Sequence, residues 1–94
     1  MNKRIKNNTF NSVSIIMPMR NSSTTVTESL KSLELQRYSI KEVIVIDNAS
    51  EDNSLKVVSQ YKKRTKLAIK IIARAKNGGI GSSYNLGVKN AKSS

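Results

Sequence analysis

The sequence contains neither cysteine nor histidine, and its aromatic residues are one phenylalanine and three tyrosines. These absences exclude disulfide bonds, thiol nucleophiles, Cys/His zinc sites and any catalytic triad built on histidine. A chain without cysteine fits a reducing compartment, and a cytoplasmic location is predicted because neither a membrane helix nor a signal peptide is recognised in the sequence. The scarcity of aromatic side chains also disfavours binding to single-stranded nucleic acid, which relies on stacking of bases.

Long apolar runs are absent as well. A membrane-spanning helix needs about 20 apolar residues, and no run in the sequence approaches that length. The basic N-terminus, MNKRIKNNTFN, is followed by only VSIIM, which is shorter than the apolar region of about 7–15 residues in a signal peptide. Residues 1–11 are therefore predicted to be a polar, mobile lead-in to a domain that covers residues 12–94.

Acidic residues are missing from the second half of the chain. The net charge is +11, all six carboxylates lie between Glu28 and Asp52, and residues 53–94 carry ten Lys or Arg. One interpretation is attraction to phosphate, in a nucleic acid, an anionic membrane or a nucleotide. The other is a lysine-rich surface that only faces water.

Three apolar runs alternate with three segments of helical spacing. The predicted strands are Val13–Met17, ended by Pro18, then Glu42–Ile46 and Leu67–Ala73. The predicted helices cover about 25–36, 50–64 and 82–92, with Glu51 and Asp52 in the first turn of the second helix. The unbroken VIVI at 43–46 is typical of a strand buried on both faces. The order βαβαβα predicts an α/β fold with a parallel sheet and right-handed crossovers.

Polar turns follow all three predicted strands: PMRN, DNASEDNS and NGGIG. In a parallel sheet these turns meet at the carboxyl edge, where open α/β sheets bind ligands. Asp47 ends the second strand, and its carboxylate can accept hydrogen bonds from ribose hydroxyls or a base N–H, or it can cap its own turn. The sequence leaves both roles of Asp47 open. It also leaves open whether NGGIG binds a ligand or is an ordinary turn. Gly87, inside the third helix, indicates either close packing on the sheet or space for a ligand.

Two well-known phosphate-binding motifs are absent. A P-loop requires GxxxxGK[ST], and the dinucleotide fingerprint requires GxGxxG after the first strand. The first strand is followed by Pro18, Met19, Arg20 and Asn21, without glycine, and Gly79-Ile-Gly81 follows the wrong strand. A receiver-like fold is disfavoured too, because the third strand ends near Arg74 and Asn77 where that fold needs a carboxylate.

The motifs taken together resemble the N-terminal half of a family 2 glycosyltransferase, from about Ser12 to Ser94. The resemblance is carried by VSIIMPMRN, by EVIVIDNASEDNS, and by the pattern N-x-G-x(5)-N-x-G through Asn77, Gly79, Asn85 and Gly87. It implies a GT-A fold that binds a nucleotide-diphosphate sugar at the carboxyl edge of the sheet. The implied nucleotide-sugar-binding residues are Pro18, Arg20, Asn21, Asp47, Asn48, Ser50, Asp52, Asn77, Gly79 and Asn85. The form of the DNAS turn is closer to rhamnosyl- and galactofuranosyl-type members than to the DDGS type.

Two departures from the family pattern bear on activity. Arg20 stands where members often have Tyr or Phe, and it either pairs with a phosphate or points to solvent. The family's metal-binding D-x-D, expected to hold Mg²⁺ or Mn²⁺, and its catalytic base come after the point matched by Ser94. Inverting transfer needs a base for the acceptor hydroxyl and a cation for the leaving diphosphate. The sequence therefore predicts a glycosyltransferase-like fragment, truncated before the D-x-D strand, that binds donor nucleotide and is inactive alone.

The alternative hypothesis is a small basic α/β module that binds nucleic acid or an anionic membrane. Of these two ligands, nucleic acid is disfavoured. Contact with the inner face of the membrane stays open. As a fragment, the chain would leave its first strand at an exposed sheet edge, which promotes aggregation. Poor solubility or partial folding of the isolated chain is predicted on that ground.

Overall fold

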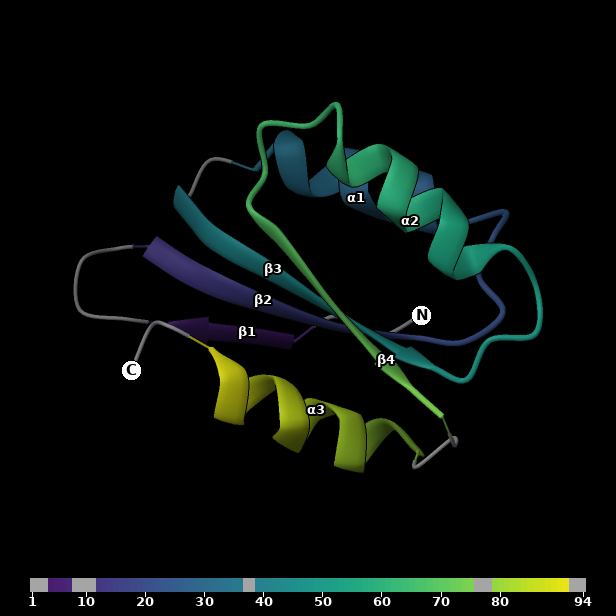
Figure 1. The fold of residues 1–94 in the computed structure, drawn as a ribbon. Coiled ribbons are helices and arrows are strands. Elements are labelled where there is room, and N and C mark those ends of the chain that lie inside the picture. The colour runs from purple at the N-terminus through teal and green to yellow at the C-terminus, as the bar shows by residue number, and fades with distance from the viewer. Residues whose placement is uncertain (1–3, 8–11, 37–38, 76–78, 92–94) are drawn as a thin grey trace.

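The computed structural model describes residues 4–7, 12–36, 39–75 and 79–91. Along the chain these form β1 (Arg4–Asn7), β2 (Ser12–Met19), α1 (Val26–Glu34), β3 (Ser39–Asn48), α2 (Ser54–Lys62), β4 (Ile69–Arg74) and α3 (Gly79–Asn90). The strands make one sheet in the order β1-β2-β3-β4, in which β2, β3 and β4 are parallel. Helices α1 and α2 cover one face of the sheet, and α3 covers the other (Figure 1). The predicted α/β architecture is confirmed.

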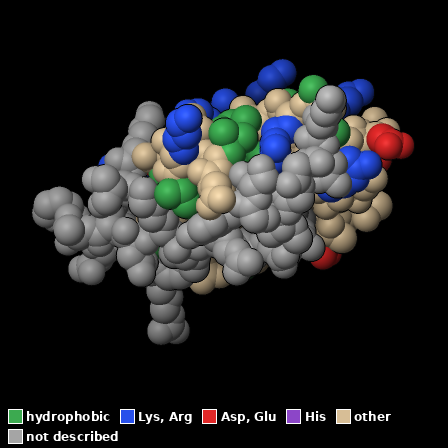
Figure 2. Space-filling model, turned by 90° about the horizontal axis from the view of Figure 1, so that it is seen from below, with side chains coloured by type: hydrophobic (Ala, Val, Ile, Leu, Met, Phe, Trp, Pro, Cys, Tyr) green, Lys and Arg blue, Asp and Glu red, His purple; other side chains and the backbone are tan. Residues whose placement is uncertain are grey.

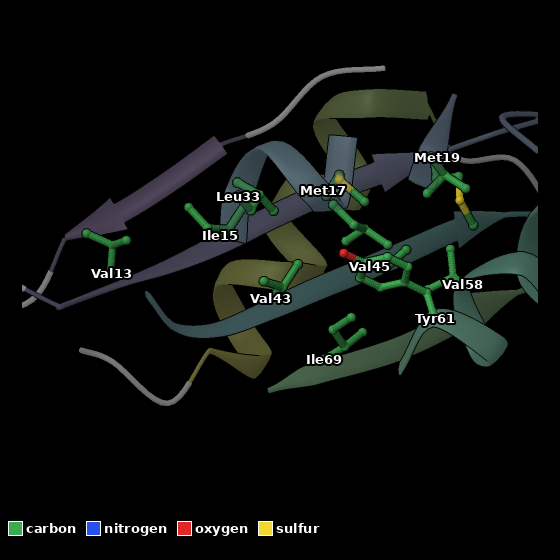
Figure 3. Packing of buried hydrophobic residues seen from close by; sticks show 12 residues of the cluster. Val13, Ile15, Met17, Met19, Leu33, Val43, Val45, Val58, Tyr61 and Ile69 are labelled. Carbon is green, nitrogen blue, oxygen red and sulfur yellow. The ribbon is translucent and has the colours of Figure 1, made fainter. Parts of the chain in front are cut away.

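The central strand β3 is apolar on both faces because helices lie on both sides of it. Val43 and Val45 belong to the larger cluster under α1 and α2, whereas Ile44 and Ile46 belong to a smaller cluster under α3. Figure 3 shows the larger cluster, in which alternate residues of β2 and β3 lie with Leu33 of α1 and with Val58 and Tyr61 of α2. The alternation of side chains along a strand thus explains the continuous VIVI run.

Strand β1 is a correction to the sequence prediction. Arg4–Asn7 lies within the segment expected to be a mobile lead-in, yet it pairs antiparallel with residues 13–16 of β2. The sheet is therefore not wholly parallel, and β2 is not the exposed edge over its first half. This pairing covers backbone donors and acceptors that would otherwise template aggregation. The physical ground for predicting poor solubility is correspondingly weaker.

Pro18 also lies differently from the prediction. It does not end the first strand, because β2 continues through it to Met19, and it pairs with Ile46 of β3. Proline lacks the N–H that a central strand uses for its ladder. Here β1 pairs with β2 only as far as Ile16, so β2 is an edge strand at Pro18 within the described residues. An edge position tolerates the missing donor.

Gly87 is explained by close packing of α3 on the sheet. A Cβ added at this position would overlap Cγ2 of Ile16 and would lie 3.1 Å from Cδ1 of Ile46. Helix α3 packs across both β2 and β3, and Gly87 itself is buried. Of the two explanations that the sequence left open, packing against the sheet is the one observed. No helix in the described ranges has the combined length and apolarity needed to cross a bilayer.

Candidate functional site

The carboxyl ends of the three parallel strands lie side by side, as predicted. Met19 of β2 pairs with Asp47 of β3, and Asp47 pairs with Ala73 of β4. Two polar turns leave this edge: the first turn, residues 20–25, follows β2, and the second turn, residues 49–53, follows β3. The turn after β4 includes residues 76–78, which lie outside the described residues. The candidate site is this edge with its first and second turns.

Asn21 joins the first turn to the second through both its backbone and its side chain. Its backbone N–H donates to Oγ of Ser50 at 2.9 Å, and its Oδ1 accepts from the backbone N–H of Glu51 at 2.8 Å. Asn21 has φ of 49° and Ala49 has φ of 54°. The left-handed region suits asparagine but is strained for alanine, so the packing of the two turns must hold Ala49 in place.

Arg20 lies against the second turn, with 36% of its side chain exposed. Its Nη1 donates to the carbonyl oxygens of Asn48 at 2.8 Å and of Ala49 at 3.0 Å, while Nη2 pairs with Glu51 at 3.4 Å. The role of Arg20 as a phosphate ligand, which the sequence left open, stays a prediction. The guanidinium satisfies the carbonyls at the end of β3, and thereby helps to hold Ala49 in its strained conformation.

Asp47 is buried at the rim, with only 4% of its surface exposed. Ser50 donates a short hydrogen bond from its Oγ to Oδ1 of Asp47. Among the described residues no group donates to Oδ2. Asp47 shares its face of β3 with Val43 and Val45, because side chains alternate along the strand. One carboxylate oxygen is thus fixed by the turn, and the other keeps its capacity to accept a hydrogen bond.

Asp52 is fully engaged in holding the two turns together. Its Oδ1 accepts from the backbone N–H of Ser54 at 2.9 Å and from the Ser54 hydroxyl, and its Oδ2 accepts from the backbone N–H of Ser23 at 3.1 Å. The Ser54 hydroxyl in turn accepts from the backbone N–H of Ser22 at 2.6 Å. Asn53 occupies the N-cap position of α2, and Asp52, one residue earlier, caps the first N–H of the helix through its side chain. The expectation that Glu51 and Asp52 lie within the first helical turn is wrong.

The two turns are joined by two chains of hydrogen bonds with the same order of groups. In each, a backbone N–H of the first turn donates to a serine hydroxyl, which donates to an aspartate: Asn21 through Ser50 to Asp47, and Ser22 through Ser54 to Asp52. Ser22 and Ser54 were not among the predicted site residues. Ser22 lies in the first turn and Ser54 is the first residue of α2, and a single serine at such a position carries no motif of its own.

The hydrogen bonds around Asp52 make stability depend on pH. The bond from the Ser54 hydroxyl is the main cause that lowers the pKa of Asp52 from its ordinary 3.8 to about 2. Because the pKa is lower in the folded chain, the ionised carboxylate stabilises the fold above about pH 4, and this contribution is lost as the pH falls toward about 2. We expect Asp52→Asn to flatten the fall of the melting temperature between these pH values.

The matched control for this measurement is Glu28→Gln. Glu28 is an exposed carboxylate on α1 that makes no hydrogen bond with any described residue. Glu34, whose pKa is lowered by hydrogen bonds from Tyr61 and Thr65, remains in both variants and so cancels in the comparison. Equal pH slopes in the wild type, the Asp52 variant and the control would contradict the capping role.

The other predicted site residues have different surroundings. Asn48 is buried, and its Oδ1 accepts from Nη1 of Arg74 at 3.3 Å at the end of β4. Gly79 is the first residue of α3, and Asn85 is an exposed residue on that helix. Asn77 lies outside the described residues. Thus the structure brings Arg20, Asn21, Asp47, Asn48, Ser50 and Asp52 together, whereas Asn85 lies on α3, which covers the other face of the sheet.

No set of metal ligands assembles among the described residues. Groups of three or more His, Cys, Asp or Glu side chains, as a protein-held metal ion would need, do not occur in that part of the chain. Both oxygens of Asp52 accept hydrogen bonds from Ser23 or Ser54, and one oxygen of Asp47 accepts from Ser50. The residues present therefore do not fit a cation site held by this edge alone.

Comparison with known proteins identifies the family. The model of glycosyl transferase family 2 matches residues 14–94. The chain belongs to this family. A poly(ribitol-phosphate) beta-glucosyltransferase of Bacillus spizizenii is 35% identical over 82 residues, which cover 85% of this chain and 13% of that protein. The first and second turns of this family 2 chain lie within the matched residues.

Two solved glycosyltransferase structures share the fold. Residues 1–349 of TarS from Staphylococcus aureus superpose with a TM-score of 0.74 at 36% identity, covering 85% of this chain and 24% of that one. A mannosyltransferase of Pyrobaculum calidifontis, in complex with GDP-mannose and Mn²⁺, gives a TM-score of 0.77 at 23% identity, covering 87% and 24%. The family 2 chain thus spans about an eighth to a quarter of the lengths of these proteins.

Proposed function

We propose that the edge formed by the first and second turns is the nucleoside-binding half of a sugar-nucleotide donor site. The observation that carries the proposal is Asp47, a buried carboxylate at the carboxyl end of β3 with one oxygen fixed by Ser50 and the other accepting from no described residue. Vicinal ribose hydroxyls and the N–H of a base are both donors, and an ionised carboxylate only accepts. A nucleoside is the ligand class that this acceptor suits.

The remaining residues of the proposed site act mainly on the shape of the turns. Arg20, Asn21 and Asp52 hold the turns in position through hydrogen bonds to the other turn, so their effect on a ligand is indirect. Residues in direct reach of the nucleotide are proposed to be Pro18, Asp47, Asn48, Ser50, Asn77, Gly79 and Asn85. Arg20 is placed among the positioning residues because its donors already bind Asn48, Ala49 and Glu51.

In the complete family domain we propose transfer of a sugar from a nucleotide diphosphate to a saccharide or lipid acceptor, as part of polysaccharide biosynthesis. A divalent cation, Mg²⁺ or Mn²⁺, would stabilise the charge on the leaving diphosphate when bound. The residues 1–94 have no carboxylate after Asp52, so we infer that they bind the nucleotide without transferring the sugar. A cytoplasmic location, with the inner membrane face as an option, stays a prediction.

The acceptor class is suggested by charge. The Bacillus spizizenii relative and the Staphylococcus aureus relative, which is 33% identical over 81 residues, are both named as transferases of poly(ribitol-phosphate). Such a polymer carries a negative charge on every phosphodiester. A chain with a net charge of +11 attracts a polyanion over long range. We therefore propose an acceptor that carries phosphodiesters.

A thermal-shift comparison tests the donor proposal. We expect uridine, guanosine and thymidine diphosphates, screened one by one, to include at least one that raises the melting temperature in a saturable manner. Pyrophosphate at the same concentration is the control, because it carries the charge without the nucleoside. If pyrophosphate stabilises the chain as much as every nucleotide does, the recognised group is the phosphate and the nucleoside site is refuted.

A further inference from the structure

A basic groove lies at the opposite end of the sheet from the proposed donor site. It is a pocket of about 580 Å³ at the amino ends of β3 and β4, lined by Lys41, Glu42, Lys62, Leu67, Ala68, Ile69 and Lys70. We call it the lysine groove. The donor site is formed where the same strands end, so the lysine groove is a separate feature of the surface.

The charges of the lysine groove are not neutralised from within the described chain. Lys41, Lys62 and Lys70 are exposed, and none of them has an ion pair with any described residue. Glu42 is the one carboxylate in the lining, is 5% exposed, and accepts a hydrogen bond from Oγ of Ser14 at 2.7 Å. Lys63 and Lys66 follow α2 and are exposed as well. The groove therefore presents a net positive charge to solvent.

The distribution of acidic residues supports a difference in charge between the two ends of the sheet. All six carboxylates precede Asn53, and Glu51 and Asp52 lie in the second turn, at the donor end. Figure 2, which views the molecule from the α3 side, shows Lys and Arg side chains along the rim of the described surface. The acidic side chains in that view lie toward the right, the end at which Figure 1 places the second turn. Glu51 and Asp52 thus lie at the end of the sheet opposite to the lysine groove.

We propose that the lysine groove binds a phosphodiester chain joined through a polyol, as a holding site for the acceptor remote from the reacting end. The lining has three lysines for phosphates, and the partly buried Leu67 for the carbon atoms between them. Among the described residues of the lining there is no aromatic ring on which a base could stack. A concave site also fits a chain better than the flat surface of a bilayer.

The reach of a polymer explains how two distant sites can serve one acceptor. The molecule is 37 Å in its longest dimension, so one extended chain of several repeats can contact both ends, whereas a small acceptor cannot. This inference rests on the phosphodiester acceptor named in the proposed function, and not on the nucleotide. Nucleotide binding is therefore measured on the same variants. This measurement distinguishes a wrong proposal for the lysine groove from a wrong proposal for the donor site.

The test compares two triple variants of equal charge. Lys41→Gln, Lys62→Gln and Lys70→Gln empty the groove of its cations, while Lys31→Gln, Lys56→Gln and Lys89→Gln remove three exposed lysines elsewhere. Each lowers the net charge of +11 by three. Binding of a fluorescent glycerol-phosphate oligomer is measured by anisotropy over a range of salt concentrations. Parallel titrations use an oligothymidylate of equal phosphate number and phosphatidylcholine–phosphatidylglycerol vesicles.

We expect the groove variant to bind the oligomer about tenfold or more weakly than the wild type does. The slope of its plot of log affinity against log salt should fall by about 2 units in magnitude. The affinity of the control variant should change by less than about threefold. A Lys→Arg triple at the groove should retain binding. Equal losses in the two Gln variants would overturn the proposal, and so would tighter binding of the oligothymidylate or binding to the vesicles alone. Should the Gln triple not fold, Lys62→Gln and Lys70→Gln alone decide the matter by the same comparison with Lys56→Gln.

Discussion

Replacing Gly87 with valine should destabilise the chain by about 3 kcal/mol, the upper part of the usual range for overpacking a core. The added Cβ would overlap Cγ2 of Ile16 and would lie 3.1 Å from Cδ1 of Ile46, and the two γ-methyl groups extend further into the same space. Isoleucine is branched at Cβ and has little rotamer freedom with which to yield. Helix α3 must therefore move off the sheet or force β2 and β3 to shift.

Thermal unfolding followed by far-UV circular dichroism measures this effect. For a domain of this size, about 3 kcal/mol corresponds to a fall of roughly 12–24 °C in melting temperature. Lys89→Val is the matched control, since it places the same side chain at an exposed position of α3 and costs only about 0.5 kcal/mol in helix propensity. A melting temperature of Gly87→Val equal to that of Lys89→Val would show that α3 does not pack closely on β2 and β3.

The sheet was predictable because its signals are local. The run at 43–46 is apolar without alternation, and a strand with helices on both faces requires that pattern. Asp47 directly after this run could be placed at the carboxyl edge for the same reason. Strand β1 could not be predicted: RIKN has no apolar periodicity, and it becomes a strand only because β2 offers an edge to pair with. This is tertiary context overriding local propensity.

The role of each polar residue in the turns depends on contacts that no local pattern encodes. Arg20 meets the carbonyls of Asn48 and Ala49, and Asp52 meets the backbone of Ser23, each across 28 or 29 residues of sequence. From the sequence, Asp47 was the acceptor expected to face a nucleoside, and Asp52 was included in the site by resemblance to the family. The structure separates them, because Asp52 has both oxygens occupied by the protein whereas Asp47 has one.

Replacing Asp47 with alanine should weaken nucleotide binding by about 10–150-fold. A hydrogen bond to a charged group contributes about 1.5–3 kcal/mol, and each 1.4 kcal/mol is a factor of ten in affinity. Asp47→Asn keeps the shape of the side chain and an oxygen that can accept from Ser50, so the fold is retained while the negative charge is lost. We expect the asparagine variant to bind with intermediate affinity. Glu28→Ala, an exposed acid on α1, should bind as the wild type does.

Isothermal titration of the wild type and of Asp47→Asn with the best nucleoside diphosphate tests the central claim most directly. The account predicts one saturable site in the wild type and an affinity at least about fivefold lower in the variant, at an unchanged melting temperature without ligand. Equal affinities in two equally stable proteins would mean that the carboxylate at the end of β3 does not face the nucleoside, and the donor-site proposal would then be wrong.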